Sequence, residues 1–181
     1  LAALVVFPVV WIVFASLKNQ ADLFDSMLIP RDGIRSLSFD NYRTLFTKLP
    51  FFGWMLNSIF IASTQTVATV MLGTLGGFAL AKYRFTGRRV FMSIMFATML
   101  LPGQVLLPSS YELMRTFGWI DQFIAIIVPG AVSVFGLFLF MQSIKGVPDE
   151  TLDAARIDGA SELHIWWQII LPSIRPMIGA F

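Results

Sequence analysis

The sequence contains no cysteine and a single histidine, His164, among its 181 residues. Without cysteine the chain cannot form a disulfide framework, a thiolate nucleophile or a cysteine-ligated zinc site. His164 has no second metal ligand nearby, so we interpret it as a surface histidine. A phosphate-binding loop of the G-x-x-x-x-G-K-[ST] type is also absent from the sequence. We therefore expect no catalytic residue, no metal and no cofactor, and any ATP would have to be bound by a partner.

Charged residues are scarce as well. They make up 13% of the chain, whereas soluble domains carry roughly 25%. Hydrophobic residues reach 56%, and the mean hydropathy is +0.74. Because so few charges cannot cover the surface of a soluble globule, the sequence predicts a membrane-embedded protein. A net charge of only +2, without a basic stripe, argues against nucleic-acid binding.

Apolar runs alternate with polar segments, which predicts an all-α, polytopic transmembrane helical bundle. Both ends of the chain fall inside apolar runs, so we read 1–181 as one transmembrane domain truncated at both ends, with about four complete or nearly complete spans. The run 51–81 would form about 46 Å of helix, longer than the ~30 Å hydrocarbon core. The predicted segments are span 1–17, external loop 18–50, spans 51–81, 90–111 and 122–144, cytoplasmic loop 145–167, and the start of a fifth span, 168–181.

Two features refine these spans. The span 90–111 contains Pro102, Gly103 and Pro108, and is therefore expected to kink or break. The turn 82–89 carries four positive charges and no negative one, which indicates a cytoplasmic position. Alternation of the spans then places 18–50 and 112–121 outside and 145–167 inside.

The segment 145–167 is unlike an ordinary membrane connector, because it has five acidic and two basic residues. Asp149 suits the positive end of a helix dipole, and the helix should end near Asp158, where Gly159 supplies a left-handed residue. Ser161 can cap a second helix. Its apolar face is predicted from the spacing of Leu163, Trp166, Trp167 and Ile170. The net negative charge argues against DNA binding, and the residues alone leave open an interfacial elbow or a docking surface for a soluble partner.

One pattern in this segment has a fixed register: Asp153-Ala154-Ala155, then Gly159, Ile169 and Leu171-Pro172. It resembles the E-A-A…G…I-x-L-P loop that marks permease subunits of ABC importers, with Asp153 where glutamate is usual. Further likenesses point to the carbohydrate-uptake branch, near the smaller permease subunit of maltose-type transporters. They are Asp40-Asn41-Tyr42, Asn57-Ser58, Ala81–Arg88 and Leu101-Pro102.

This resemblance implies a bacterial inner-membrane, multi-pass transport subunit that is not itself an enzyme. Its expected partners are a cytoplasmic ATP-binding cassette ATPase, a second permease subunit, an extracytoplasmic solute-binding protein and membrane lipid, but no nucleic acid. The solute would be a sugar or oligosaccharide. The residues expected to couple to the ATPase are Asp149, Glu150, Asp153, Ala154, Ala155, Asp158, Gly159, Ile169, Leu171 and Pro172.

The solute path is less readable. In-membrane polar residues that could line it are Asn57, Gln65, Thr69 and Gln104, although hydrogen bonding between helices is the more common role for each of them. The predicted spans 1–17, 51–81, 90–111 and 122–144 have no charge in their interior, which disfavours an ion-coupled secondary transporter. That alternative, a structural membrane subunit without transport and a membrane-embedded enzyme are the competing functions.

Overall fold

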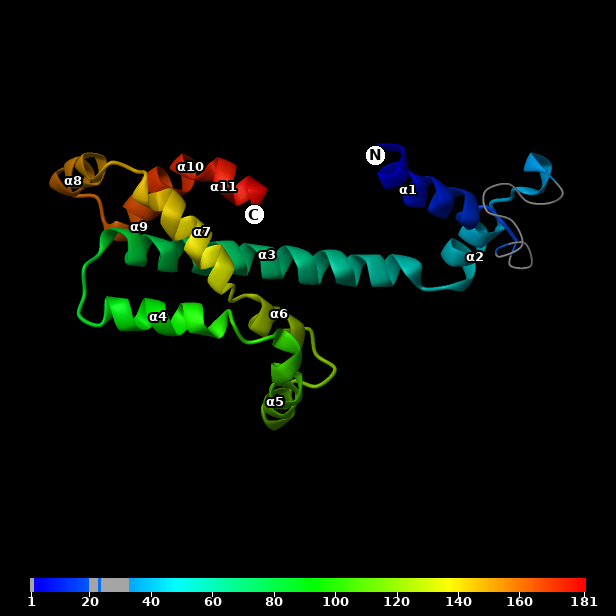
Figure 1. The fold of residues 1–181 in the computed structure, drawn as a ribbon, viewed down its shortest axis with the longest axis horizontal. Helices are drawn as coiled ribbons and strands as arrows, with labels where there is room; N and C mark the ends of the chain where they lie inside the picture. Colours follow the sequence, from blue (N-terminus) through cyan, green and yellow to red (C-terminus); the bar gives the residue numbers. More distant parts are fainter. Residues whose placement is uncertain (1, 20–22, 24–32) are drawn as a thin grey trace. The chain divides into compact units, whose positions relative to one another are not determined.

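The computed structural model describes residues 2–19, 23 and 33–181, and within these ranges it is helical with no strand. The all-α prediction is confirmed for this part of the chain. The elements, labelled in Figure 1 where there is room, are α1 Ala2–Ser16, η1 Ile34–Ser36, α2 Asp40–Lys48, α3 Phe51–Lys82, α4 Arg88–Thr98, α5 Gly103–Thr116, α6 Ile124–Gly130, α7 Val134–Lys145, α8 Asp149–Ile157, α9 Glu162–Ile165, η2 Trp166–Ile170, α10 Leu171–Ser173 and α11 Arg175–Ala180.

The chain divides into two compact units, 1–59 and 60–181. In the first unit, α2 is tied to the end of α1 by Asn41, whose Nδ2 donates to the carbonyl oxygens of Ser16 and Lys18 at 2.9 and 2.8 Å. Ser16 is the last residue of α1, where carbonyls accept no hydrogen bond within the helix, so the Asn41 side chain acts as a cap. The predicted external loop 18–50 lies partly outside the described residues, and its described part contains η1 and α2.

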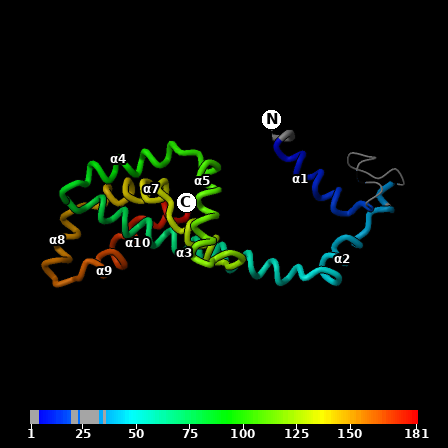
Figure 2. The backbone as a smooth tube through the Cα atoms, turned by 90° about the horizontal axis from the view of Figure 1, so that it is seen from below, coloured from blue at the N-terminus to red at the C-terminus, as the bar shows by residue number. Residues whose placement is uncertain are grey.

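The core of the second unit lies where α7 crosses the second half of α3, an arrangement seen in Figure 1 and again in Figure 2. The helices approach closely because α3 presents glycines: a Cβ on Gly77 would lie 2.9 Å from the backbone nitrogen of Met141. Trp166 also reaches α3, and its Nε1 donates to the Thr74 hydroxyl at 3.3 Å. The core cluster is Phe78, Phe140, Ile144, Val147, Leu152, Ile165, Trp166, Ile170 and Ile174.

Within the described ranges, one helix, α3, is long and apolar enough to cross a membrane by length and composition. Two bent pairs pass the same test if each is one span: α4 with α5, bent by 100°, and α6 with α7, bent by 42°. The bend between α4 and α5 falls at Pro102, as the prolines predicted, because a proline lacks the N–H that would continue the helix. Pro108 lies inside α5 without ending it, and α5 continues to Thr116, into the segment expected to be a polar link.

The second helix of the 145–167 segment differs from its predicted apolar face. Residues Trp166–Ile170 form a π-helical segment, which rotates the following side chains relative to an α-helix. Ile165, Trp166 and Ile170 are buried, whereas Leu163 and Trp167 are exposed. The predicted apolar face is therefore confirmed for Trp166 and Ile170, and it was wrong for Leu163 and Trp167.

Candidate functional site

The residues at both ends of helix α8 are types that favour a helix start and a helix end. Pro148 is at the N-cap position in extended conformation, and Asp149 and Glu150 follow in the first turn, where the helix dipole favours acidic groups. Arg156 lies in the last turn, where a positive charge is favoured. The helix is fixed to the core through Leu152, which is 1% exposed. A short helix is thus held on one face by an apolar anchor.

The end of α8 is closed by a Schellman motif. Gly159 has φ +84°, the left-handed conformation that favours glycine. The Gly159 N–H donates to the Arg156 carbonyl at 3.0 Å, and the Ala160 N–H donates to the Ala155 carbonyl at 2.9 Å. Both alanines also pack against the core cluster. Gly159 therefore turns the chain sharply while the carbonyls at the helix end stay paired.

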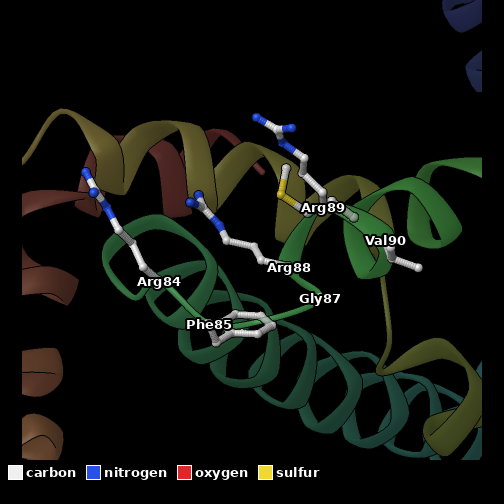
Figure 3. A pocket seen from close by; sticks show the side chains of 7 residues that line it. Arg84, Phe85, Gly87, Arg88, Arg89 and Val90 are labelled. Atoms are coloured by element: carbon white, nitrogen blue, oxygen red, sulfur yellow. The ribbon is translucent and has the colours of Figure 1, made fainter.

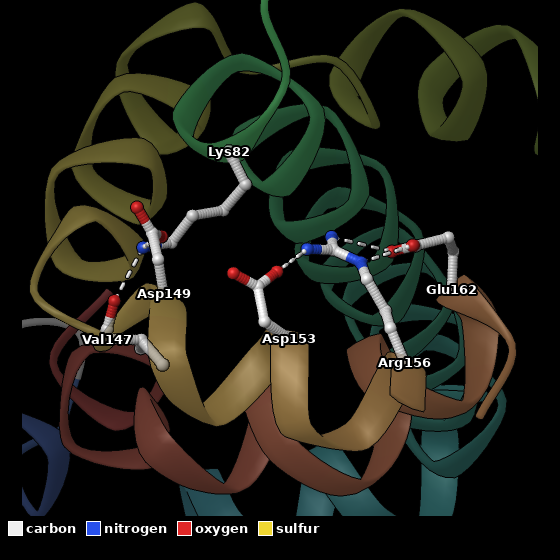
Figure 4. A network of polar contacts seen from close by, with 6 residues as sticks. All are labelled: Lys82, Val147, Asp149, Asp153, Arg156 and Glu162. Atoms are coloured by element: carbon white, nitrogen blue, oxygen red, sulfur yellow. Dashed lines mark hydrogen bonds and ion pairs between the residues drawn. The ribbon is translucent and has the colours of Figure 1, made fainter. Parts of the chain in front are cut away.

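A polar bridge crosses this turn (Figure 4). The Arg156 guanidinium donates to Glu162, at the start of α9, through Nε at 2.8 Å and Nη2 at 3.3 Å, and to Asp153 through Nη1 at 2.8 Å. Hydrogen bonding to Arg156 lowers the pKa of the Glu162 carboxyl, and hydrogen bonding to Glu162 raises the pKa of Arg156. The two-pronged contact to Glu162 fixes direction as well as distance between α8 and α9.

The start of α8 is held from α3. Lys82, the last residue of α3, donates through Nζ to the Val147 carbonyl at 2.5 Å and to Asp149 Oδ1 at 2.6 Å (Figure 4). The Lys82 side chain is 7% exposed while that of Asp149 is 75% exposed. Hydrogen bonding to Lys82 lowers the pKa of Asp149. Sequence reasoning counted Lys82 only as part of a basic turn, because nothing in the sequence relates it to a helix more than 60 residues away.

Five exposed residues of α8 and its C-cap form one stripe, from which the exposed Thr151 is set apart. Glu150, Asp153, Ala154, Ile157 and Asp158 are all exposed and follow the i, i+3, i+4, i+7, i+8 spacing of a single helix face. Ile157 is 86% exposed, so acidic side chains surround an uncovered apolar centre. Sequence reasoning missed Ile157, although this spacing from Glu150 was available to reveal it. We call these five residues the α8 face.

The last residues expected to take part in coupling lie below this face. Ala155, Ile169 and Leu171 pack partly buried against the core cluster, while Pro172 is exposed within α10. The structure therefore separates the predicted set into residues that are exposed and residues that pack the loop against the core. His164 is exposed, and its backbone N–H donates to Ser161 Oγ at 3.3 Å, which forms the predicted cap.

Two of the four polar residues expected along the solute path come together. Gln65 and Thr69 line an open cavity of about 480 Å³, and Gly130 and Ser133 line it from the opposite side. The Thr69 hydroxyl donates toward the carbonyl oxygens of Gln65, at 2.8 Å, and Gly130, at 3.2 Å. Asn57 and Gln104 are exposed and are not among the residues that line this cavity.

The chain is similar in sequence to known transport proteins. The chain is 32% identical over 181 residues to the arabinooligosaccharides transport system permease protein AraQ of Bacillus subtilis, a match that covers 99% of this chain and 64% of that protein. It is 31% identical over 185 residues to the sn-glycerol-3-phosphate transport system permease protein UgpE of Salmonella typhimurium, covering 98% and 65%. The chain thus spans a little under two thirds of the length of these relatives.

A solved structure and a protein family also match. The structure is a bacterial ABC transporter involved in the import of the acidic polysaccharide alginate, with a TM-score of 0.84 and 26% identity over 99% of this chain and 62% of that one. The family, described as binding-protein-dependent transport system inner membrane component, matches residues 73–181. This range is more than half of the chain and includes the whole of α8. The chain therefore belongs to the family of binding-protein-dependent transport system inner membrane components.

Proposed function

We propose that the chain is the larger part of a permease subunit in an ATP-driven, binding-protein-dependent ABC importer for a sugar or oligosaccharide. The observation that carries this proposal is the α8 face, an exposed helix face held rigidly at both ends, within a chain of this family. The name of one relative, for arabinooligosaccharide transport, supports the solute class, and the name of another, for sn-glycerol-3-phosphate transport, supports a transport role without supporting that class. An ion-coupled secondary transporter is not favoured by these names.

In this proposal the α8 face docks on the ATPase subunit. Ala154 lets the partner backbone approach closely, and Ile157 offers an apolar contact that has no cover in this chain. Glu150 and Asp158 surround that contact with negative charge, which suits a groove with a basic rim. Asp153 is exposed but already paired with Arg156, so its charge is partly neutralised within the loop.

The contacts around α8 suit it to transmit movement. The Lys82 contact joins its start to the end of α3, and the Arg156–Glu162 bridge joins its end to α9. Leu152 adds an apolar anchor between them. A displacement of α8 by the ATPase would therefore move α3 and α9 with it instead of bending the loop.

We further propose that solute passes near the cavity lined by Gln65 and Thr69, with a second permease subunit completing the path and a solute-binding protein delivering the solute. Hydroxyl and amide groups suit a neutral sugar because they donate and accept hydrogen bonds without an accompanying charge. The membrane placement follows the sequence: 18–50 and 112–121 outside, 82–89 and 145–167 in the cytoplasm, in a bacterial inner membrane.

The test uses the full-length gene product, tagged in its native membranes and extracted in mild detergent. We expect an ATP-binding cassette ATPase to co-purify with it. Ala154→Arg should remove the ATPase because it places a long cation at the point of closest approach. The matched control is Thr116→Arg, which adds the same side chain at an exposed position of α5 that we place on the opposite side of the membrane.

The outcomes are distinct. Loss of the ATPase with Ala154→Arg, and its retention with Thr116→Arg, supports docking through α8. Equal retention by both variants contradicts docking at this face. If no ATPase co-purifies with the unaltered protein while the second permease does, the importer proposal itself is wrong.

A further inference from the structure

The turn between α3 and α4 carries three arginines that the proposed function does not use. Arg84, Arg88 and Arg89 line an open cavity of about 600 Å³ together with Phe85, Gly87, Val90 and Met92. In Figure 3 the three arginine side chains extend from the turn toward the same side, while the Phe85 ring lies on the other side. Three arginine side chains thus line one open space.

These arginines have no acidic partner in the part of the chain that the structure describes. The ion pairs there join Lys82 to Asp149, Arg115 to Glu112, and Arg156 to Asp153 and Glu162. Asp149 lies within electrostatic range of Arg84, but its Oδ1 is held by Lys82. Three cations at one place repel one another, and an anion bound among them would relieve that repulsion.

The hydrogen-bonding capacity of Arg88 is not fully satisfied by the described residues. The Nε of Arg88 is buried and has no hydrogen-bond partner among the described residues. Leaving a buried charged donor unpaired is unfavourable, and buried polar groups normally have partners. The start of α4 lacks a side-chain cap too, because Gly87 occupies the N-cap position. An oxyanion in this cavity would accept hydrogen bonds both from the guanidinium groups and from the first turn of α4.

The apolar surface beside the arginines restricts what that anion can be. Directly after Arg89, α4 exposes Val90, Phe91 and Ile94, which are 63%, 50% and 60% exposed. A cationic first turn followed by an exposed apolar face is complementary to a molecule with an anionic head and an apolar tail. A free phosphate would leave this face uncovered, and an acidic protein segment would cover the charges without needing the apolar residues.

We propose that this cavity binds the phosphate of an anionic phospholipid, with Arg84, Arg88 and Arg89 holding the headgroup and an acyl chain lying along the exposed face of α4. Arginine suits this role because its planar guanidinium can donate two parallel hydrogen bonds to one phosphate. The proposal needs only the membrane location of the family, and it is independent of ATPase docking through α8.

The test measures which lipids the assembled transporter keeps. Full-length transporter is reconstituted in vesicles of equimolar phosphatidylglycerol and phosphatidylcholine and re-extracted, and the retained lipids are identified by native mass spectrometry. The test variant replaces Arg84, Arg88 and Arg89 with glutamine. The matched control replaces Arg43, Lys48 and Arg115 with glutamine, which removes the same number of exposed positive charges from α2 and α5.

We expect the unaltered transporter and the control to retain phosphatidylglycerol preferentially. Each arginine near an anionic lipid surface contributes roughly fivefold in affinity, so the test variant should bind phosphatidylglycerol roughly a hundredfold more weakly. A preference that survives in the test variant, or falls equally in the control, overturns the proposal. Millimolar inorganic phosphate should not displace the lipid, and displacement would identify a free-anion site instead.

A second variant covers the case in which the glutamine variant does not insert. Replacing the three arginines with lysine keeps the charge that orients the spans but removes the planar fork. We expect its phosphatidylglycerol retention to fall below that of the unaltered protein while its assembly is normal. Undiminished retention contradicts the arginine geometry. If the glutamine variant keeps its lipid but loses the ATPase, the surface serves a protein partner and the lipid proposal is wrong.

Discussion

Substitution of Gly159 can show whether this position needs glycine for its left-handed backbone conformation or for the space that a side chain would fill. A Cβ placed on Gly159 meets no atom within 4 Å, so alanine introduces no clash inside this chain. Its cost comes only from the left-handed conformation at φ +84°, roughly 1–2 kcal/mol for an ordinary residue. Asparagine adopts that conformation more readily than alanine although it is larger. We therefore expect Gly159→Asn to be less harmful than Gly159→Ala.

Hydrogen exchange at the Ala160 amide reports the turn directly, because this N–H donates to the Ala155 carbonyl within the Schellman motif. A penalty of that size corresponds to roughly 5- to 30-fold faster exchange in Gly159→Ala, with a smaller increase in Gly159→Asn. The second assay is solute uptake per ATP hydrolysed by the reconstituted full-length transporter. The same order of variants is expected in both assays.

Gly118 provides the matched control. It also has a positive φ, +69°, and a Cβ there meets nothing within 4 Å, but it lies between α5 and α6. Gly118→Ala should therefore accelerate exchange locally without changing uptake per ATP. If Gly159→Ala gives more uptake per ATP hydrolysed than Gly159→Asn, the size of the side chain facing the ATPase matters more than the backbone conformation, and the backbone argument is refuted.

The aspartate variant tests charge at the same position. Gly159→Asp has nearly the same shape as Gly159→Asn but adds a negative charge directly beside Asp158. We expect the protein to insert and ATP hydrolysis to become uncoupled from uptake, since the added carboxylate repels Asp158 at the edge of the α8 face. Normal uptake with the aspartate variant would falsify the role given to Gly159.

Three further predictions concern packing and pH. Gly77→Ala should destabilise the helix crossing in thermal unfolding, because its Cβ would meet a backbone atom of α7 at 2.9 Å, whereas Gly76→Ala meets only a flexible side-chain end and should be tolerated. Thr74→Val leaves the buried Trp166 N–H unpaired and should lower the free energy of unfolding by about 1–3 kcal/mol. The same substitution should cost much less in a protein that already carries Trp166→Phe, because no N–H is then left unpaired. Because the pKa of Glu162 is lowered, its bridge stabilises the loop above the ordinary carboxyl range and is lost as pH falls through and below that range. The protection factors for hydrogen exchange in α8, which are corrected for the intrinsic exchange rate, should therefore be unchanged between pH 6 and 8 and fall in acid.

The local chemistry of the 145–167 segment could be predicted from sequence because it is determined by neighbours along the chain. The start of α8 after Pro148, its end before Gly159 and the cap at Ser161 each depend on residues within a few positions, and the structure has all three. The break at Pro102 belongs to the same class, since it follows from a missing backbone N–H. Local rules therefore give the positions where helices begin and end.

Features that depend on tertiary contacts could not be predicted. The π-helical segment at Trp166–Ile170 exists where Trp166 reaches Thr74 on a distant helix, and no spacing within the segment encodes that partner. The contact of Lys82 with Asp149 likewise joins residues 67 positions apart. Gln65 and Thr69 meet Gly130 for the same reason, which is why only part of the predicted solute path came together.

The register of the sequence motif has a physical explanation in this geometry. Ala155 supplies the carbonyl that the Ala160 N–H closes upon, Gly159 supplies the left-handed residue four positions later, and both alanines are small enough to pack against the core. The spacing of Ala155 and Gly159 in the motif is thus the one that a Schellman motif requires at the end of a helix. Asp153 takes the place of the usual glutamate, yet it reaches Arg156 at 2.8 Å while Arg156 also binds Glu162. Asp153 is therefore paired within the loop, although it is one methylene shorter than the glutamate of the motif.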